Sequence, residues 1–331
     1  MIGLPKQKFM PAELERHLSN SGFSTIALIG CRGTGRSFPC CEYDVLVDAK
    51  EKQIRHDVIG SKYIDLIPVP QKSTAEEAFD LLPMKIILDP NMILLGLQRD
   101  SKKEDVIKDY AISKMLEVIS ALKKAEDCHQ DKNQIDASFW IHSAALEFSS
   151  SSIALSRGAV HPTHLLDDVR DSASALGISY EIISDAMNLQ RASRTSVERR
   201  LAGINEVILS SLQIQEGSPE SVYVYSKQLN EKISWLLKNH AILQAYTFLG
   251  YESVRMLKHI YYRFCQDAGI PLHHSRIITE ILDRSEVPYR LSHESFKLLA
   301  IENEANILST LQGLGTLVEV VRKKATTERL N

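Results

Sequence analysis

The sequence lacks the cysteine pairs that mark a zinc site or a disulfide framework. It has five cysteines, and none of them forms a C-x-x-C pair. It also lacks an apolar run near the roughly 20 residues that a membrane span requires, and its N-terminus has no apolar core typical of a signal peptide. We therefore expect no membrane partner, and we place the protein in the reducing cytoplasm.

The sequence has little excess charge of either sign. Its formal net charge is −3, so the broad basic surface of a dedicated nucleic-acid-binding protein is missing, and only a local patch could serve that purpose. The apolar and charged fractions are those of a globular protein. A chain of 331 residues is too long for one compact core of ordinary size, which favours two domains.

Residues 1–100 are predicted to form a small α+β domain, in which a mixed sheet is flanked by helices. Apolar runs of strand length alternate here with turn residues and with two helical patterns. We expect helices over residues 11–21 and 73–82, and strands over 25–29, 43–47, 53–59, 62–69 and 85–88.

Residues 101–331 are predicted to form an all-helical domain. Apolar residues recur there at helical spacing and strand-like alternation is scarce. The periodic stretches include residues 112–122, 277–282 and 307–321. Glycine, proline and polar clusters predict breaks near residues 129–134, 158–162, 177, 217–219, 269–271 and 285–288.

The stretch from Ser24 to Lys50 carries the residues with the clearest chemistry. Three glycines, at 30, 33 and 35, follow an apolar strand and would let the backbone turn sharply and present N–H groups to an anion. Glu42 and Asp44 then fall on one face of the next strand, since side chains alternate along it. Two carboxylates so placed repel each other unless a cation lies between them, which indicates a Mg²⁺ site.

The same glycine segment matches the phosphate-loop pattern G-x-x-x-x-G-K-[ST], with Arg36 in place of the lysine. A phosphate loop must open directly into a helix whose N-terminus holds the phosphates. Here the residues after Ser37 lead into a strand-like run instead. This interpretation is therefore disfavoured, and helix after Ser37 would be needed to support it.

The order of these residues resembles the DNA polymerase beta-like nucleotidyltransferase superfamily, especially its minimal and kanamycin-type members. Their signature is a Gly-Ser loop, roughly ten residues, then two carboxylates separated by one apolar residue. This chain has Gly30-Cys31, ten residues, then Glu42-Tyr43-Asp44, with the expected helix and strand before them. The resemblance covers about the first hundred residues, including the final strand and turn at Ile86–Pro90.

The resemblance implies a role for each residue of the motif. Gly30 and Cys31 would hold the phosphates of an incoming NTP, and Glu42, Asp44 and Asp65 would be catalytic ligands of two Mg²⁺ ions. Arg32 and Arg36 could clamp the triphosphate, because guanidinium groups match phosphate oxygens. The helical domain would bind the acceptor and carry any homo-oligomer contacts. The acceptor hydroxyl could belong to a small molecule, an RNA end or a protein.

Two features leave alternatives open. Cys31 stands where the signature has serine, and Glu42 where aspartate is commoner, so a degenerate member that only binds a nucleotide or a partner is a second hypothesis. For the third carboxylate we favour Asp65, which has apolar neighbours on both sides, and Asp57 and Asp48 are the alternatives. No residue beyond position 100 can be assigned as a general base.

Overall fold

The computed structural model describes residues 10–49, 54–70, 74–211, 219–268, 276 and 307–327. The chain forms two compact units. The first comprises Met1–Ile107 together with Glu216–Lys232, and the second comprises Lys108–Gln215 and Ile233–Asn331. The sequence predicts a single division at residue 100, with everything after it in the helical part. The difference arises because the first part of one late helix packs with the sheet.

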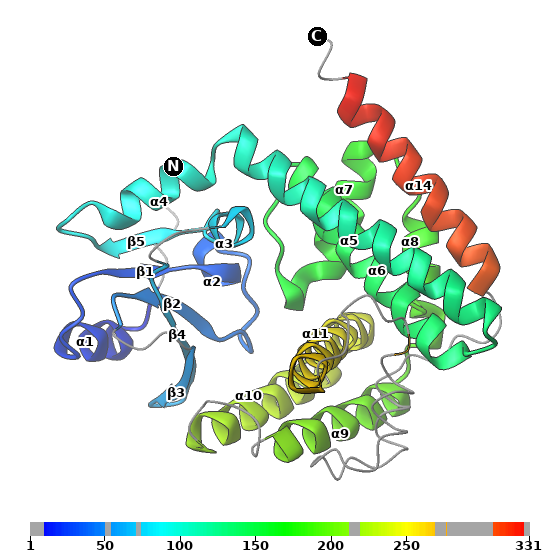
Figure 1. Cartoon of the computed structure of the whole chain (residues 1–331). Coiled ribbons are helices and arrows are strands. Elements are labelled where there is room, and N and C mark those ends of the chain that lie inside the picture. Colours follow the sequence, from blue (N-terminus) through cyan, green and yellow to red (C-terminus); the bar gives the residue numbers. More distant parts are fainter. Residues whose placement is uncertain are drawn as a thin grey trace, which may run out of the picture. The chain divides into compact units, whose positions relative to one another are not determined.

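The first unit is a small mixed sheet with helices, as predicted (blue to cyan in Figure 1). The strands are β1 (Ile26–Leu28), β2 (Tyr43–Val47), β3 (Arg55–Ile59), β4 (Lys62–Pro68) and β5 (Lys85–Leu88). Their order is β3-β4-β2-β1-β5; β2 and β4 are parallel and the other neighbours are antiparallel. The helices are α1 (Ala12–Asn20), α2 (Gly30–Thr34), α3 (Ala75–Asp80) and α4 (Ile93–Ser101).

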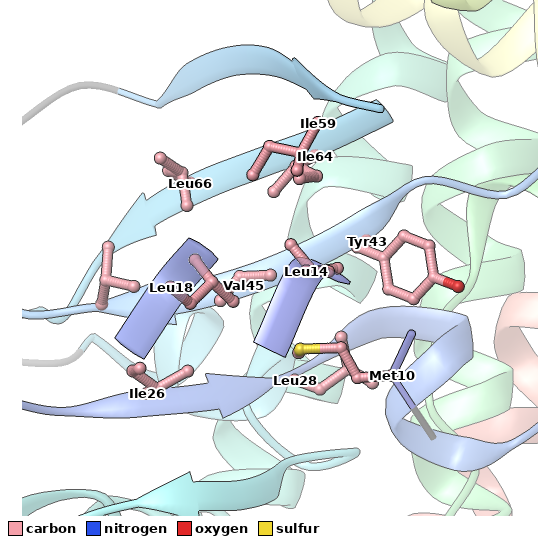
Figure 2. Packing of buried hydrophobic residues seen from close by; sticks show 11 residues of the cluster. Met10, Leu14, Leu18, Ile26, Leu28, Tyr43, Val45, Ile59, Ile64 and Leu66 are labelled. Carbon is pink, nitrogen blue, oxygen red and sulfur yellow. The ribbon is translucent and has the colours of Figure 1, made fainter. Parts of the chain in front are cut away.

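Alternation along the strands gives the sheet two apolar faces. On one face, Leu14 and Leu18 of α1, one helical turn apart, pack against strand residues that include Ile26, Val45 and Leu66 (Figure 2). The other face has its own cluster, formed by Ala27, Ile29, Leu46, Leu81, Met84 and Leu94. Apolar side chains therefore cover both faces of the sheet. Because burying an unpaired polar group is costly, we expect polar side chains of the strands to lie near an end of the sheet.

The predicted ends of the elements agree with the structure where both are described. Helix α1 stops at Asn20, just before Gly22, whose φ is +78°. Helix α3 begins with a capping box, in which the Thr74 hydroxyl accepts from the Glu77 N–H and the Glu77 carboxylate accepts from the Thr74 N–H. The predicted start at Ser73 and the first residue of the 53–59 strand lie outside the described residues.

The second unit is helical throughout the part that the structure describes. Most of its elements lie wholly within it: α6 (Gln134–Leu155), η1 (Pro162–His164), α7 (Leu165–Leu176), α8 (Tyr180–Ala186), η2 (Leu189–Arg191), α9 (Arg194–Ser211), α11 (Ile242–Ala268) and α14 (Ile307–Thr327). Helices α5 (Glu104–Gln130) and α10 (Pro219–Lys238) begin in the first unit and continue into the second.

The predicted breaks near residues 129–134, 158–162 and 177 fall between these helices. The predicted helix over 277–282 and the breaks near 269–271 and 285–288 lie outside the described residues. Among the described helices, none has the length and apolar character needed to cross a membrane.

His142 of α6 makes the stability of the second unit sensitive to acid. The side chain is buried, and burial, helped by the charge of Arg200, lowers its pKa to about 3. In the unfolded chain an imidazole titrates at about 6.5, so acid protonates the unfolded state first and favours unfolding. Between pH 7 and pH 5 the loss should reach about 2 kcal/mol of unfolding free energy.

Denaturant unfolding across this pH range would test the effect. His142→Met, which cannot titrate, should flatten the pH dependence by this amount. His259→Gln, at an exposed position on α11, should leave the pH dependence unchanged. If His142→Met has the wild-type pH dependence, His142 is not the source of the acid sensitivity.

Candidate functional site

Strand alternation sends three carboxylates away from the α1 face of the sheet. Asp44 lies between Tyr43 and Val45, which both belong to the α1 cluster, so its side chain points to the opposite face. Asp65 lies in the same way between Ile64 and Leu66. Glu42 has the parity of Asp44 and directly precedes β2.

The register of the strands brings the three carboxylates together. Asp44 and Asp65 are direct partners in the parallel pairing of β2 with β4. One carboxylate oxygen each from Glu42, Asp44 and Asp65 lies within 4.8 Å of the other two. The next residue along this row is His56, the antiparallel partner of Asp65, whose Nδ1 lies 2.7 Å from an Asp65 oxygen.

The two competing acids lie elsewhere. Asp57 is on β3, where its carboxylate contacts the Arg55 guanidinium at 3.7 Å and the Val58 N–H at 2.7 Å. Asp48 lies beyond the end of β2 and accepts hydrogen bonds from the backbone N–H groups of Ser24 and Thr25. Of the three candidates, Asp65 is the one that converges with Glu42 and Asp44.

The electrostatics of the group favour a bound cation. Burial raises the pKa of Asp44 well above its usual range, and the charges of Glu42 and Asp65 raise it further. An anionic Asp44 is therefore costly in the metal-free protein. A divalent cation would reverse this cost, and three carboxylate oxygens are the donors that Mg²⁺ prefers.

The glycine segment before β2 is a short helix rather than a loop. Helix α2 begins at Gly30 and ends at Thr34, and Gly35, directly after it, adopts the left-handed conformation with φ of +76°. In the described chain no helix lies between Gly35 and β2, so the helix that a phosphate loop requires after Ser37 is absent. The alternative of a P-loop NTPase is therefore wrong.

Two of the glycines are required by close packing. Gly30 has φ of +64°, and a Cβ there would collide with the carboxylate of Asp44. A Cβ on Gly33 would collide with the backbone oxygen of Pro83. The backbone at the start of α2 therefore lies directly against the central carboxylate of the group.

Gly30→Ala should be much more damaging than Gly35→Ala, although both residues have positive φ. The left-handed backbone costs about 1–2 kcal/mol for any residue with a Cβ. A Cβ added at Gly35 would meet nothing within 4 Å, so its substitution should cost only that amount. Gly30→Ala should cost more and should also weaken Mn²⁺ binding, because it displaces Asp44. Thermal unfolding and Mn²⁺ titration of both variants would test this; equal effects would contradict it.

Arg32 fixes the backbone that carries Glu42. Its Nε donates to the carbonyl oxygens of Cys41 at 3.0 Å and of Glu42 at 2.8 Å, and its guanidinium lies 4.0 Å from the centre of the Tyr43 ring. Through these contacts Arg32, on α2, stabilises the backbone at the start of β2. Arg36 is exposed one residue beyond Gly35.

Cys31 contributes a protonated thiol at the start of α2. The side chain is buried, and its hydrogen bond with Cys41, followed by burial itself, raises its pKa far above the usual range. A thiol is a weak hydrogen-bond donor, so the contribution of Cys31 to anion binding is expected to come from its backbone N–H.

Two neighbours of the carboxylates were not predicted from the sequence. His56 touches Asp65, and the Lys232 ammonium lies 2.5 Å from an oxygen of Glu42. Lys232 follows the buried Leu229 and precedes the buried Ile233 on α10. The sequence pattern shows only that Lys232 lies on the apolar side of its helix, which indicates a buried lysine. It does not indicate that the partner is Glu42.

No family model and no curated protein matches this sequence. Among solved structures, the chain is similar to a nucleotidyltransferase-like protein from Exiguobacterium sibiricum 255-15, with 11% identity and a TM-score of 0.31. The alignment covers 94% of this chain and 89% of that chain. Because the score is low, this likeness carries no weight for the activity of the present chain.

Proposed function

We propose that this chain is a Mg²⁺-dependent nucleotidyltransferase. The observation that carries the proposal is the convergence of Glu42, Asp44 and Asp65 within 4.8 Å, directly beside the start of α2 at Gly30. The acceptor hydroxyl oxygen would attack the α-phosphorus of an NTP, and the bond to pyrophosphate would break. The nucleoside monophosphate would thereby pass to the acceptor.

The residues present fit the metal that this chemistry needs. Three converging carboxylates offer the hard oxygen donors that Mg²⁺ prefers. Burial and the charges of Glu42 and Asp65 raise the pKa of Asp44, and a bound cation would offset both effects. Bound Mg²⁺ would lower the pKa of the attacking hydroxyl and neutralise the leaving pyrophosphate. Asp44 and Asp65, as paired residues on β2 and β4, are the first candidates to hold it.

Other residues of the chain would position the triphosphate. We assign the backbone N–H groups of Gly30 and Cys31 to the phosphates, since the absence of a Cβ at Gly30 allows close approach. Arg36, exposed beyond α2, could add positive charge to the same ligand. Arg32 would act indirectly by holding the backbone of Glu42 through its hydrogen bond to that carbonyl.

We expect the acceptor to be a hydroxyl of a small molecule, an RNA end or a protein, bound with help from the helical part of the chain, and the compartment to be the cytoplasm. Incubation of the full chain with each labelled NTP, Mg²⁺ and a panel of acceptors tests the activity. Pyrophosphate release that requires Mg²⁺ would support it, and no binding or turnover of any NTP would refute it.

A second candidate function is nucleotide or partner binding without catalysis. The observation that favours it is the Lys232 ammonium on Glu42, because a positive charge on that carboxylate repels a metal ion at the same place. Calorimetry with NTP and Mg²⁺ separates the two candidates. Binding without turnover across the acceptor panel supports the scaffold, whereas pyrophosphate release excludes it.

A further inference from the structure

One face of helix α10 is polar where the helix belongs to the first unit. Ser221, Tyr225, Gln228 and Lys232 follow one another at intervals of four, three and four residues, which places them on one side of the helix. All four lie in the segment Glu216–Lys232, which is compact with the sheet. This face is therefore part of the same unit as the carboxylates.

Contacts at both ends of this face direct it toward the acidic residues. The Ser221 hydroxyl accepts from the backbone N–H of His56 at 3.1 Å, and the ring of Tyr225 lies 4.9 Å from that of His56. Lys232, at the other end, reaches Glu42. Gln228 lies between them; it is buried, and its Oε1 has no hydrogen-bond partner within the described chain.

The pair of Lys232 and Glu42 is buried and close. The distance between Nζ and the nearer carboxylate oxygen is 2.5 Å, and the two side chains are 3% and 17% exposed. A buried ammonium is costly without a counter-charge, and removing either partner would leave the other charge unpaired. The pair is therefore a fixed element of the unit, unlike an exposed ion pair that solvent screens.

We propose that the ammonium of Lys232 takes the place of one of the two cations expected at the acidic centre, so that the centre holds a single divalent ion on Asp44 and Asp65. The proposal rests on the proposed function and refines its metal requirement. The three carboxylates and the ammonium of Lys232 together carry two negative charges, and one divalent ion balances them. A second divalent ion on Glu42 would have to displace the Lys232 ammonium. The displaced ammonium would then be buried without a counter-charge, because little water reaches this position.

Mn²⁺ alone is a suitable probe, because its electron paramagnetic resonance signal counts free and bound ions. The full wild-type chain should bind one Mn²⁺. Lys232→Met, which keeps the length of the side chain and removes the charge, should bind a second Mn²⁺ or bind the first at least tenfold more tightly. Lys227→Met, at an exposed position on the same helix, should behave as wild type. Two Mn²⁺ ions on the wild-type chain would overturn the proposal.

A second variant covers the case in which Lys232→Met does not fold. Glu42→Gln combined with Lys232→Met removes the pair together and leaves no unpaired charge. With circular dichroism and thermal unfolding as checks on folding, this double variant should keep one Mn²⁺ within about threefold of the wild-type affinity. A loss of tenfold or more would show that Glu42 is itself a ligand and would overturn the proposal.

The outcomes also separate this inference from the proposed function. Two bound Mn²⁺ ions together with NTP turnover would refute the role of Lys232 and leave the transferase intact. One bound Mn²⁺ without any NTP turnover would support the role of Lys232 and refute the transferase.

Discussion

Asp44→Asn is expected to abolish nucleotidyl transfer while it stabilises the metal-free protein. Loss of the central ligand should lower turnover at least a hundredfold, since even indirect contacts to a metal are worth tenfold to a hundredfold. The raised pKa of Asp44 means that its charge opposes folding at neutral pH when no metal is bound. The neutral isostere removes that penalty and should raise the free energy of unfolding measured in EDTA.

The opposite signs of these two effects make the test specific. Pyrophosphate release would be measured with Mg²⁺, and thermal unfolding would be measured in EDTA and in Mg²⁺. Wild type should gain stability from Mg²⁺, and Asp44→Asn should not. Asp100→Asn removes an acid whose side chain is 53% exposed and should change neither quantity much. If Asp44→Asn keeps its activity, Asp44 is not a catalytic metal ligand.

Asp65→Asn should have an effect on turnover close to that of Asp44→Asn, whereas Asp57→Asn should change turnover less than about twofold. The physical reason is the register. Asp65 is paired with Asp44 across β2 and β4, while Asp57 pairs with Arg55 on β3. An exposed ion pair of this kind contributes roughly 0–1 kcal/mol, so its loss should also leave the fold intact.

Parallel measurements of pyrophosphate release and Mn²⁺ affinity would check this pair of variants. Asp65→Asn should lose both, because the amide keeps the shape of the side chain but not its charge. Asp57→Asn serves as the matched control from the neighbouring strand. The assignment of the third carboxylate would be wrong if Asp57→Asn were the inactive variant or if both variants turned over NTP normally.

The carboxylate group could largely be predicted because it depends on local rules. Alternation along a strand fixes the shared face of Glu42 and Asp44, and it applies equally to Asp65. The remaining step is strand order, which inserts β4 beside β2 and sends β3 to the edge of the sheet. The apolar neighbours of Asp65 favoured it as the third carboxylate. The polar and partly exposed residues of β3 are typical of the edge strand that it forms.

Two features could not be predicted from the sequence: that Gly30–Thr34 forms helix α2, and that Lys232 is the partner of Glu42. Five residues from Gly30 to Thr34 are too few to show helical periodicity, and two of them are glycines, which are poor helix formers. Lys232 is remote from Glu42 in the chain, and no local rule pairs residues so distant. The predicted division of the chain differs from the two units for the same reason, since the segment that includes Lys232 has the pattern of an ordinary amphipathic helix.

The membership of residues 216–232 in the first unit also sets the order in which the protein can mature during translation. The five strands leave the ribosome early, whereas Lys232, whose ammonium contacts Glu42, is synthesised much later. Chains grow at about 5–20 residues per second, so roughly 10–40 s separate the synthesis of Glu42 from that of Lys232. A fragment ending at Ile107 lacks Lys232 and would therefore keep Glu42 without this ion pair.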